Sequence, residues 1–159
     1  MRLPCPGRQS GFTLIEMIVV LTITGLLFAV GLARYQAFNQ RQVLTQAAAE
    51  LKNNLRLAQE KALAGDKPAG FCAASSLKGY RLIFTTVTAY QIRAICSDDS
   101  FQTIKTYPLP ANMAGVSDSK ILFKVLGQGT DATNTSVTFP LIYNGQTKNV
   151  VVTNTGKIE

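Results

Sequence analysis

Histidine and tryptophan are both absent from this chain of 159 residues, and only nine residues are acidic. Histidine is the commonest general base and metal ligand in proteins, so its absence removes the usual catalytic triads and much metal chemistry. Asp98, Asp99 and Asp131 do not make up a calcium-binding set. Gly127-Gln128-Gly129 lacks the Lys-Ser/Thr that completes a phosphate loop. We therefore expect no enzyme, no cofactor and no metal site.

Negative charge is also scarce relative to positive charge, because 16 Lys and Arg give a net charge of +7. A basic chain is a candidate for binding nucleic acid or an anionic surface. If the residues before the long apolar run are removed as a leader, Arg2 and Arg8 go with them, and the net charge falls to 14 minus 9, or +5. From Gly65 onward, nine basic residues stand against six acidic ones, or +3, with no cluster of adjacent cations. This distribution favours a solvated surface.

Cysteine occurs only three times, and Cys5 lies ahead of the long apolar run. Cys72 and Cys96 are therefore the only pair in the rest of the chain. An even pair downstream of an export signal indicates a disulfide formed in an oxidising compartment. The alternative is two buried free thiols.

One long apolar run covers residues 12–33, and from Met17 to Ala33 only Thr22 and Thr24 are polar. As a helix it would span roughly 33 Å, enough for a bilayer core of about 30 Å. Glu16 lies near its start. A charge at the bilayer centre is unfavourable by about 2.5 to 3.5 kcal/mol, so an acid in such a run indicates a functional site with a basic partner.

Two ordinary interpretations compete for this segment. A cleaved secretory signal would use Arg2 and Arg8 as its basic region and Gly31-Leu32-Ala33 as the small residues before the cut. The run is longer than the usual apolar region of about 7 to 15 residues, and Glu16 would have no role in it. A plain membrane anchor would let Glu16 reach the headgroups, but this leaves its neighbours unexplained.

The residues Gly11-Phe12-Thr13-Leu14-Ile15-Glu16, after a short basic leader and before an apolar helix, resemble the processing site of type IV prepilins and type II secretion pseudopilins. The resemblance implies that a prepilin peptidase cuts between Gly11 and Phe12 and methylates the new N-terminus. It also implies that the amine of Phe12 on a neighbouring subunit pairs with Glu16, which would offset the desolvation of both charges. Ala33 stands where many major pilins carry a helix-bending proline, which favours a minor subunit.

The resemblance also implies a location and a set of partners. It places the leader in the cytoplasm, one transmembrane pass in the bacterial inner membrane, and everything after Arg34 outside or in the periplasm. Charge alone does not decide this orientation, because Arg2 and Arg8 on one side face Arg34 and Arg41 on the other. The implied partners are the prepilin peptidase, other pilin subunits in a helical filament, and the membrane.

The helical period continues beyond the membrane run, with apolar residues three and four apart: Leu44, Ala47, Ala48, Leu51, Leu55, Ala58 and Ala62. No proline interrupts it before Gly65-Asp66-Lys67-Pro68, which predicts the helix end. We predict one helix over about residues 12–64. The expected organisation is a leader (1–11), a membrane and assembly half-helix (12–33), an amphipathic half-helix (34–64) and a β-rich head (65–159).

Beyond Pro68 the pattern changes to strands. Alternation and turn signals predict strands over residues 78–88, 89–96, 101–107, 121–126, 136–143 and 149–153. Asn144-Gly145 predicts a hairpin, and Pro140 predicts that its strand is an edge or carries a bulge. The fold class is therefore α+β, with the helix packed on an antiparallel sheet.

The C-terminal part carries a second resemblance. Ile121-Leu122-Phe123, Gly127 and the terminal Gly156-Lys157-Ile158 resemble the head of the GspH/FimT-type minor pseudopilins. This resemblance implies a pilin-like head with two small antiparallel sheets against the N-terminal helix.

Three functions follow as hypotheses. The leading one is a structural subunit of a type IV pilus or a type II secretion pseudopilus. The alternative is DNA capture in natural transformation, because some FimT-type minor pilins bind DNA; its candidate residues are Lys124, Lys148 and Lys157, with Lys78, Arg81 and Arg93. A membrane-anchored enzyme or sensor is the third, and no motif supports it.

Overall fold

The structure, a computed structural model, describes residues 11–132 and 135–159. The predicted leader, apart from Gly11, lies outside these residues. The chain divides into two units, residues 1–39 and residues 40–159. One helix, α1 (Leu14–Ala64), begins in the first unit and ends in the second, close to the predicted bounds.

The second half of α1 packs on the head through its apolar stripe. All seven residues of the predicted stripe are buried: Leu44, Ala47, Ala48, Leu51, Leu55, Ala58 and Ala62. The helix ends where glycine allows the chain to turn, because Gly65 adopts a φ of 61°. The amides of Gly65 and Asp66 then donate to the carbonyls of Ala62 and Lys61, both at 3.1 Å, which is the Schellman arrangement.

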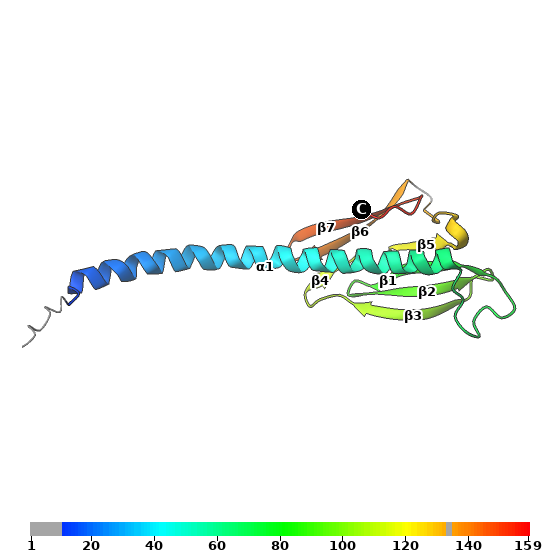
Figure 1. Ribbon diagram of the computed structural model, residues 1–159, viewed down its shortest axis with the longest axis horizontal. Helices are drawn as coiled ribbons and strands as arrows, with labels where there is room; N and C mark the ends of the chain where they lie inside the picture. Colours follow the sequence, from blue (N-terminus) through cyan, green and yellow to red (C-terminus); the bar gives the residue numbers. More distant parts are fainter. Residues whose placement is uncertain (1–10, 133–134) are drawn as a thin grey trace, which may run out of the picture. The chain divides into compact units, whose positions relative to one another are not determined.

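Four strands form the larger sheet, sheet A: β1 (Leu77–Thr86), β2 (Ala89–Cys96), β3 (Phe101–Pro108) and β5 (Lys120–Lys124). Their order is β3-β2-β1-β5, and all neighbours are antiparallel (Figure 1). Tyr80, Leu82 and Phe84 alternate on the buried face of β1, as the sequence pattern predicts. β3 differs from the other strands, since nearly all of its side chains are exposed.

Sheet B contains β4 (Met113–Ala114), β6 (Ser136–Tyr143) and β7 (Gln146–Thr153) in the order β4-β6-β7. Asn144-Gly145 forms the predicted turn, so that Tyr143 pairs with Gln146. Pro140 pairs with Asn149 in an unbroken register, and β4 reaches only Ile142 and Tyr143 on the other side. β6 is the middle strand of sheet B and has no bulge at Pro140, so neither prediction holds for the strand as a whole. Proline is tolerated there because β4 does not extend along β6 as far as Pro140.

Four strands differ from the prediction. The strand predicted over residues 78–88 ends at Thr86, because Val87 and Thr88 form the turn to β2. The strand predicted over residues 121–126 ends at Lys124, because Val125–Gly127 forms a 3₁₀ turn in which Leu126 has a φ of 55°. The last strand begins at Gln146 and not at Asn149, since the tight turn lets pairing start at once. The two-residue strand β4 was not predicted, and its length leaves no alternation to detect.

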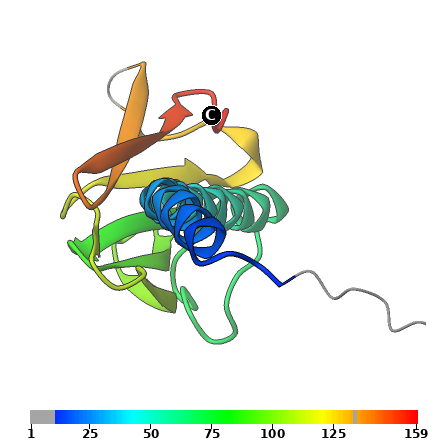
Figure 2. The same cartoon turned by 90° about the vertical axis from the view of Figure 1, so that its left-hand side faces the viewer.

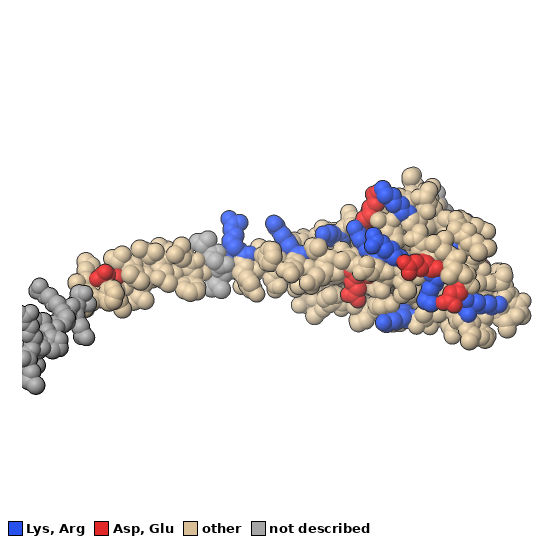
Figure 3. Space-filling model, in the orientation of Figure 1, with Lys and Arg blue, Asp and Glu red and all other residues tan. Residues whose placement is uncertain are grey.

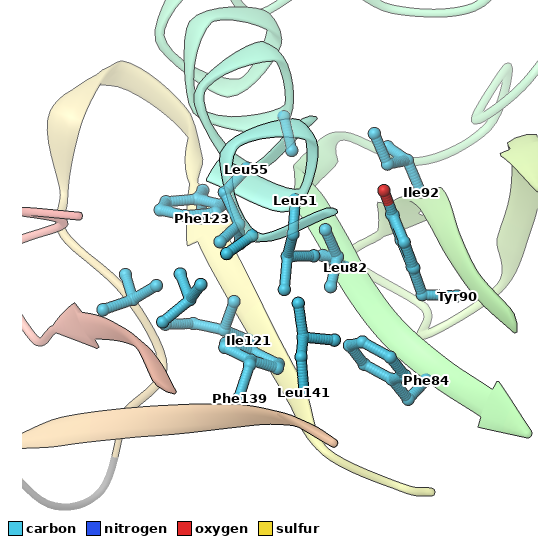
Figure 4. Close-up of a cluster of buried hydrophobic side chains, with 14 of the residues drawn as sticks. Leu51, Leu55, Leu82, Phe84, Tyr90, Ile92, Ile121, Phe123, Phe139 and Leu141 are labelled. Atoms are coloured by element: carbon cyan, nitrogen blue, oxygen red, sulfur yellow. The ribbon is translucent and has the colours of Figure 1, made fainter. Parts of the chain in front are cut away.

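The core of the head lies between the second half of α1 and both sheets (Figure 2). Figure 4 shows the labelled side chains of α1, β1, β2, β5 and β6 pointing toward one another. One polar contact is buried among them, where Asn54 Nδ2 donates to the Tyr90 hydroxyl at 2.7 Å. Burial is the main cause that raises the pKa of Tyr90 to about 12. The predicted α+β fold with two small antiparallel sheets is confirmed.

Candidate processing and assembly segment

The predicted cleavage bond lies in irregular backbone just before the helix. Gly11, Phe12 and Thr13 have no helical structure and are exposed, Phe12 to 78%. The peptide bond between Gly11 and Phe12 therefore stands outside the helical hydrogen-bond ladder. A peptidase would reach it without unwinding α1.

Thr13 and Glu16 together form the start of α1. The Glu16 amide donates to Thr13 Oγ1 at 3.3 Å, and the Met17 amide donates to the Thr13 carbonyl at 3.2 Å. Threonine at the N-cap with glutamate three residues later is the capping-box pattern. Glu16 was predicted to have a role in assembly, but the bond between its amide and Thr13 Oγ1 was not predicted. The signal was present, because Thr13-Leu14-Ile15-Glu16 matches the pattern.

The apolar run forms a helix whose described side chains, through residue 29, are all exposed. The run is long and apolar enough to cross a membrane. Its two hydroxyls bond to the helix itself: Thr22 Oγ1 donates to the Val19 carbonyl at 2.8 Å, and Thr24 Oγ1 to the Val20 carbonyl at 2.6 Å. In an apolar medium these hydroxyls would therefore need no further partner.

Glu16 has no cationic partner in residues 11–132 and 135–159. The ion pairs seen there are Lys61–Asp66, Lys78–Asp99 and Lys157–Glu159. A positive group to compensate Glu16 in an apolar medium must therefore come from elsewhere. The pairing with a neighbouring amine stays a prediction.

A disulfide joins Cys72 and Cys96 across 24 residues, with their Cα atoms 5.7 Å apart. It links the connection that follows α1 to the last residue of β2. Both cysteines are buried. The bridge therefore belongs to the head and fixes a segment that has little regular structure of its own.

The structure disperses the lysines considered for DNA binding. Lys124 ends β5, Lys148 lies near the start of β7, and Lys157 follows the other end of β7. Lys148 Nζ donates to Thr45 Oγ1 at 3.2 Å, and Lys157 pairs with Glu159 at 2.5 Å. On the face of the head seen in Figure 3, basic and acidic side chains are interspersed. Lys148 and Lys157 therefore lie toward opposite ends of β7.

The acidic residues considered for calcium have structural contacts. Asp98 Oδ1 accepts from the Ser100 amide at 3.1 Å and closes a turn. Asp99 accepts from Lys78 at 2.6 Å, and Asp131 Oδ1 accepts from the Leu122 amide at 2.7 Å. Among the residues that the structure describes, no three such ligands come together to hold a metal ion.

Comparison with known families identifies the chain. A family model described as type II transport protein GspH matches residues 47–156, more than half of the sequence. The chain belongs to the GspH family. A second model, the prokaryotic N-terminal methylation motif, matches residues 6–32 of this GspH-family chain and so contains Gly11, Phe12 and Glu16. Both family resemblances predicted from the sequence are confirmed.

Similar curated proteins share part of their length with this GspH-family chain. A fimbrial protein of Pseudomonas aeruginosa is 35% identical over 80 residues, which is 50% of this chain and 51% of that protein. The type IV major fimbrial protein FimA of Dichelobacter nodosus is 36% identical over 64 residues, 40% of each chain. A probable minor fimbrial protein of the same organism is 41% identical over 56 residues, 35% of each chain.

The chain therefore spans about half the length, or less, of the curated relatives it matches. No solved structure matches it. The comparisons give the DNA-binding alternative no support.

Proposed function

We propose that this GspH-family chain is a minor structural subunit of a type IV pilus or a type II secretion pseudopilus. Residues 1–11 serve as the leader, residues 12–33 anchor the chain in the inner membrane and then in the filament, and residues 34–64 connect them to the head at 65–159. The observation that carries the proposal is the apolar start of α1, whose described side chains are exposed and which contains one carboxylate.

The match to the methylation motif supports processing at the bond between Gly11 and Phe12. The cut would create an amine at Phe12, and this amine is the cation that Glu16 requires. In a filament the amine comes from a neighbouring subunit, because a carboxylate and an amine that are both removed from water gain most by pairing. The names of the curated relatives, which are fimbrial proteins, support assembly into such a filament.

N-terminal sequencing and intact mass of the chain purified from membranes test this proposal. With prepilin peptidase present, we expect a chain that begins at Phe12 and carries one added methyl group. Without the peptidase, or with Gly11→Val, residues 1–11 should remain. A mature chain that begins at Arg34 would instead establish a secretory signal, and an uncut chain in the presence of peptidase would establish a plain anchor.

A further inference from the structure

The side of sheet A that faces away from α1 carries most of the unpaired positive charge of the sheet. Along each strand, side chains alternate between the core and this second face, and the register aligns them across strands. We call this second face the outer face; it includes Arg81, Ile83, Gln91, Arg93, Phe101, Thr103, Lys120 and Lys124.

Two arginines lie directly opposite each other on the outer face. The register of β1 and β2 pairs Arg81 with Arg93. Like charges at directly opposed positions of an antiparallel pair repel each other. Such a pair therefore destabilises the sheet unless an anion lies between the two guanidinium groups.

Arg93 is held in place by its neighbours. Its Nε and Nη2 donate to Gln91 Oε1 at 2.9 and 2.7 Å, and its guanidinium carbon lies 4.4 Å from the centre of the Phe101 ring. Arg93 is thus fixed by neutral groups, which leave its charge uncompensated.

Arg81 lacks even a neutral partner in the part of the chain that the structure describes. Its Nε is buried and has no hydrogen-bond acceptor. Buried polar groups are nearly always paired, and an exception often marks a place where a water, an ion or a ligand belongs. The unpaired Nε and the facing arginine are two independent observations that lead to the same place.

Within residues 11–132 and 135–159, no carboxylate forms an ion pair with these cations, although Asp99 lies close enough to Arg81 for an electrostatic interaction. None of the three ion pairs seen there includes Arg81, Arg93, Lys120 or Lys124. Asp99, at the turn between β2 and β3, already accepts from Lys78 at 2.6 Å. An acidic partner would therefore meet cations that have no competing carboxylate bonded to them.

The strand next to Arg93 is open to a partner. β3 is the last strand on its side of sheet A, so its second edge is unpaired by any described strand. Its apolar side chains Phe101 and Ile104 are 55% and 38% exposed. Exposed edges of this kind are sites of association, and they bind extended segments through backbone hydrogen bonds.

We infer that the outer face, centred on Arg81 and Arg93, binds an acidic segment of another protein subunit. A carboxylate of the partner lies between the two guanidinium groups, and apolar residues beside it cover Phe101 and Ile83. Arginine suits this role because its planar group binds a carboxylate through two hydrogen bonds. The inference rests on the proposed function for the nature of the partner, a different subunit of the same assembly.

A protein carboxylate fits the site better than nucleic acid does. DNA is bound by cations that follow a run of successive phosphates. Here the two arginines are half-buried and bounded by Phe101, Ile83 and Leu122, so they favour one acidic group with apolar neighbours.

Fluorescence anisotropy with a labelled ten-residue oligoglutamate peptide tests the inference on the full chain in detergent. We expect Arg81→Gln/Arg93→Gln to weaken binding by at least about tenfold, because it removes both bidentate donors. The matched control, Arg41→Gln/Arg56→Gln, removes the same charge from exposed positions of α1 and should change affinity by less than about twofold. Equal losses in the two variants would overturn the inference.

A second variant and two further probes complete the test. Arg81→Lys/Arg93→Lys keeps the charge and should still lose part of the affinity, since lysine cannot bind bidentately. Tighter binding of a DNA duplex of equal charge, lost in the Gln variant, would assign the face to nucleic acid and overturn the inference. Self-association of the wild-type chain that depends on both arginines would overturn it in favour of a second copy.

The binding assay does not depend on cleavage or filament assembly. A chain that is never cut but binds the peptide through Arg81 and Arg93 would refute the proposed function and leave the face intact. A chain that is cut and assembled but binds no peptide would refute the inference about the outer face and leave the proposed function intact.

Discussion

The two halves of α1 are both rich in leucine, yet they differ completely in burial. Through residue 29 every described side chain of the first half is exposed, whereas the stripe from Leu44 to Ala62 is buried. The first half is apolar on all sides, which calls for an apolar medium around it; the second half is apolar on one stripe, which suits a sheet. The arrangement of apolar residues around the helix, more than their number, separates the two environments.

Equal substitutions in the two halves should give the largest contrast in stability. Leu55 is fully buried, and Leu55→Ala should lower the free energy of unfolding of the head by about 3 kcal/mol through lost contacts and a cavity. Leu26→Ala should leave it unchanged, because Leu26 is exposed. Urea unfolding of the full chain in detergent, followed by tyrosine fluorescence, measures both. Similar losses would mean that the halves fold as one cooperative unit.

The disulfide should contribute almost as much, and again only to the second unit. Cys72→Ser/Cys96→Ser removes a bridge that closes 24 residues and should lower the free energy of unfolding by about 3 kcal/mol. A reductant should destabilise the wild-type chain similarly and should not affect the double variant. Helicity of the first half, measured in detergent by circular dichroism, should not change. An unchanged urea midpoint in the double variant would contradict this prediction.

The buried contact between Asn54 and Tyr90 should have a smaller, pH-dependent effect. Tyr90→Phe leaves the Asn54 amide without its acceptor and should lower the free energy of unfolding by about 1 to 2 kcal/mol. Since burial raises the pKa of Tyr90 to about 12, the folded state keeps the proton that the unfolded chain releases near pH 10. Stability is therefore full below about pH 10 and falls as the pH rises toward 12.

Denaturant curves at several pH values measure this loss. Burial also raises the pKa of Tyr80, so the fall should persist in part in Tyr90→Phe. A wild-type stability that stays constant from pH 10 to pH 12 would count against burial of the hydroxyl.

The smallest effect on the stability of the head should come from substituting Glu16, the acid in the first half of α1. Glu16→Ala should leave the unfolding of the head and the cut at Gly11 unchanged, because Glu16 lies in the first unit and its bond to Thr13 is made by the backbone amide, which alanine keeps. Its incorporation into sheared filaments, measured by immunoblot, should fall to near background. Glu60→Ala, an exposed acid of the second half, is the matched control and should be incorporated normally. Normal incorporation of Glu16→Ala would leave the acid without an assembly role.

Much of the fold is encoded in local patterns. The stripe from Leu44 to Ala62, the stop at Gly65 and the turn at Asn144-Gly145 each act within a few residues, and the structure places all three as predicted. The end of β5 is different, since the apolar residues Val125 and Leu126 follow Lys124 with no turn residue before Gly127. The strand stops there because Leu126 enters the left-handed region, which a leucine rarely does.

Long-range pairing was harder to predict than strand positions. β5 pairs with β1 across some 40 residues, and this pairing requires glycine at position 79, because a methyl group there would overlap the Phe123 carbonyl oxygen. The apposition of Arg81 and Arg93 likewise depends on the register of two strands, so it could not be predicted from the sequence of either strand alone. For the candidate site, the motif from Gly11 to Glu16 was visible in the sequence, whereas the bond from the Glu16 amide to Thr13 needed the structure.

That cap has an electrostatic consequence if the chain is cut after Gly11. The aligned peptide groups of a helix place about half a positive charge at its N-terminal end, which attracts anions and repels cations. The cut adds an ammonium group at Phe12, one residue ahead of the cap at Thr13. Glu16 is the only acid between residues 12 and 49 that can oppose the combined charge. Proteolysis would thus add a full positive charge at the helix end, so that the chain can form this ion pair with its neighbours only after the leader has gone.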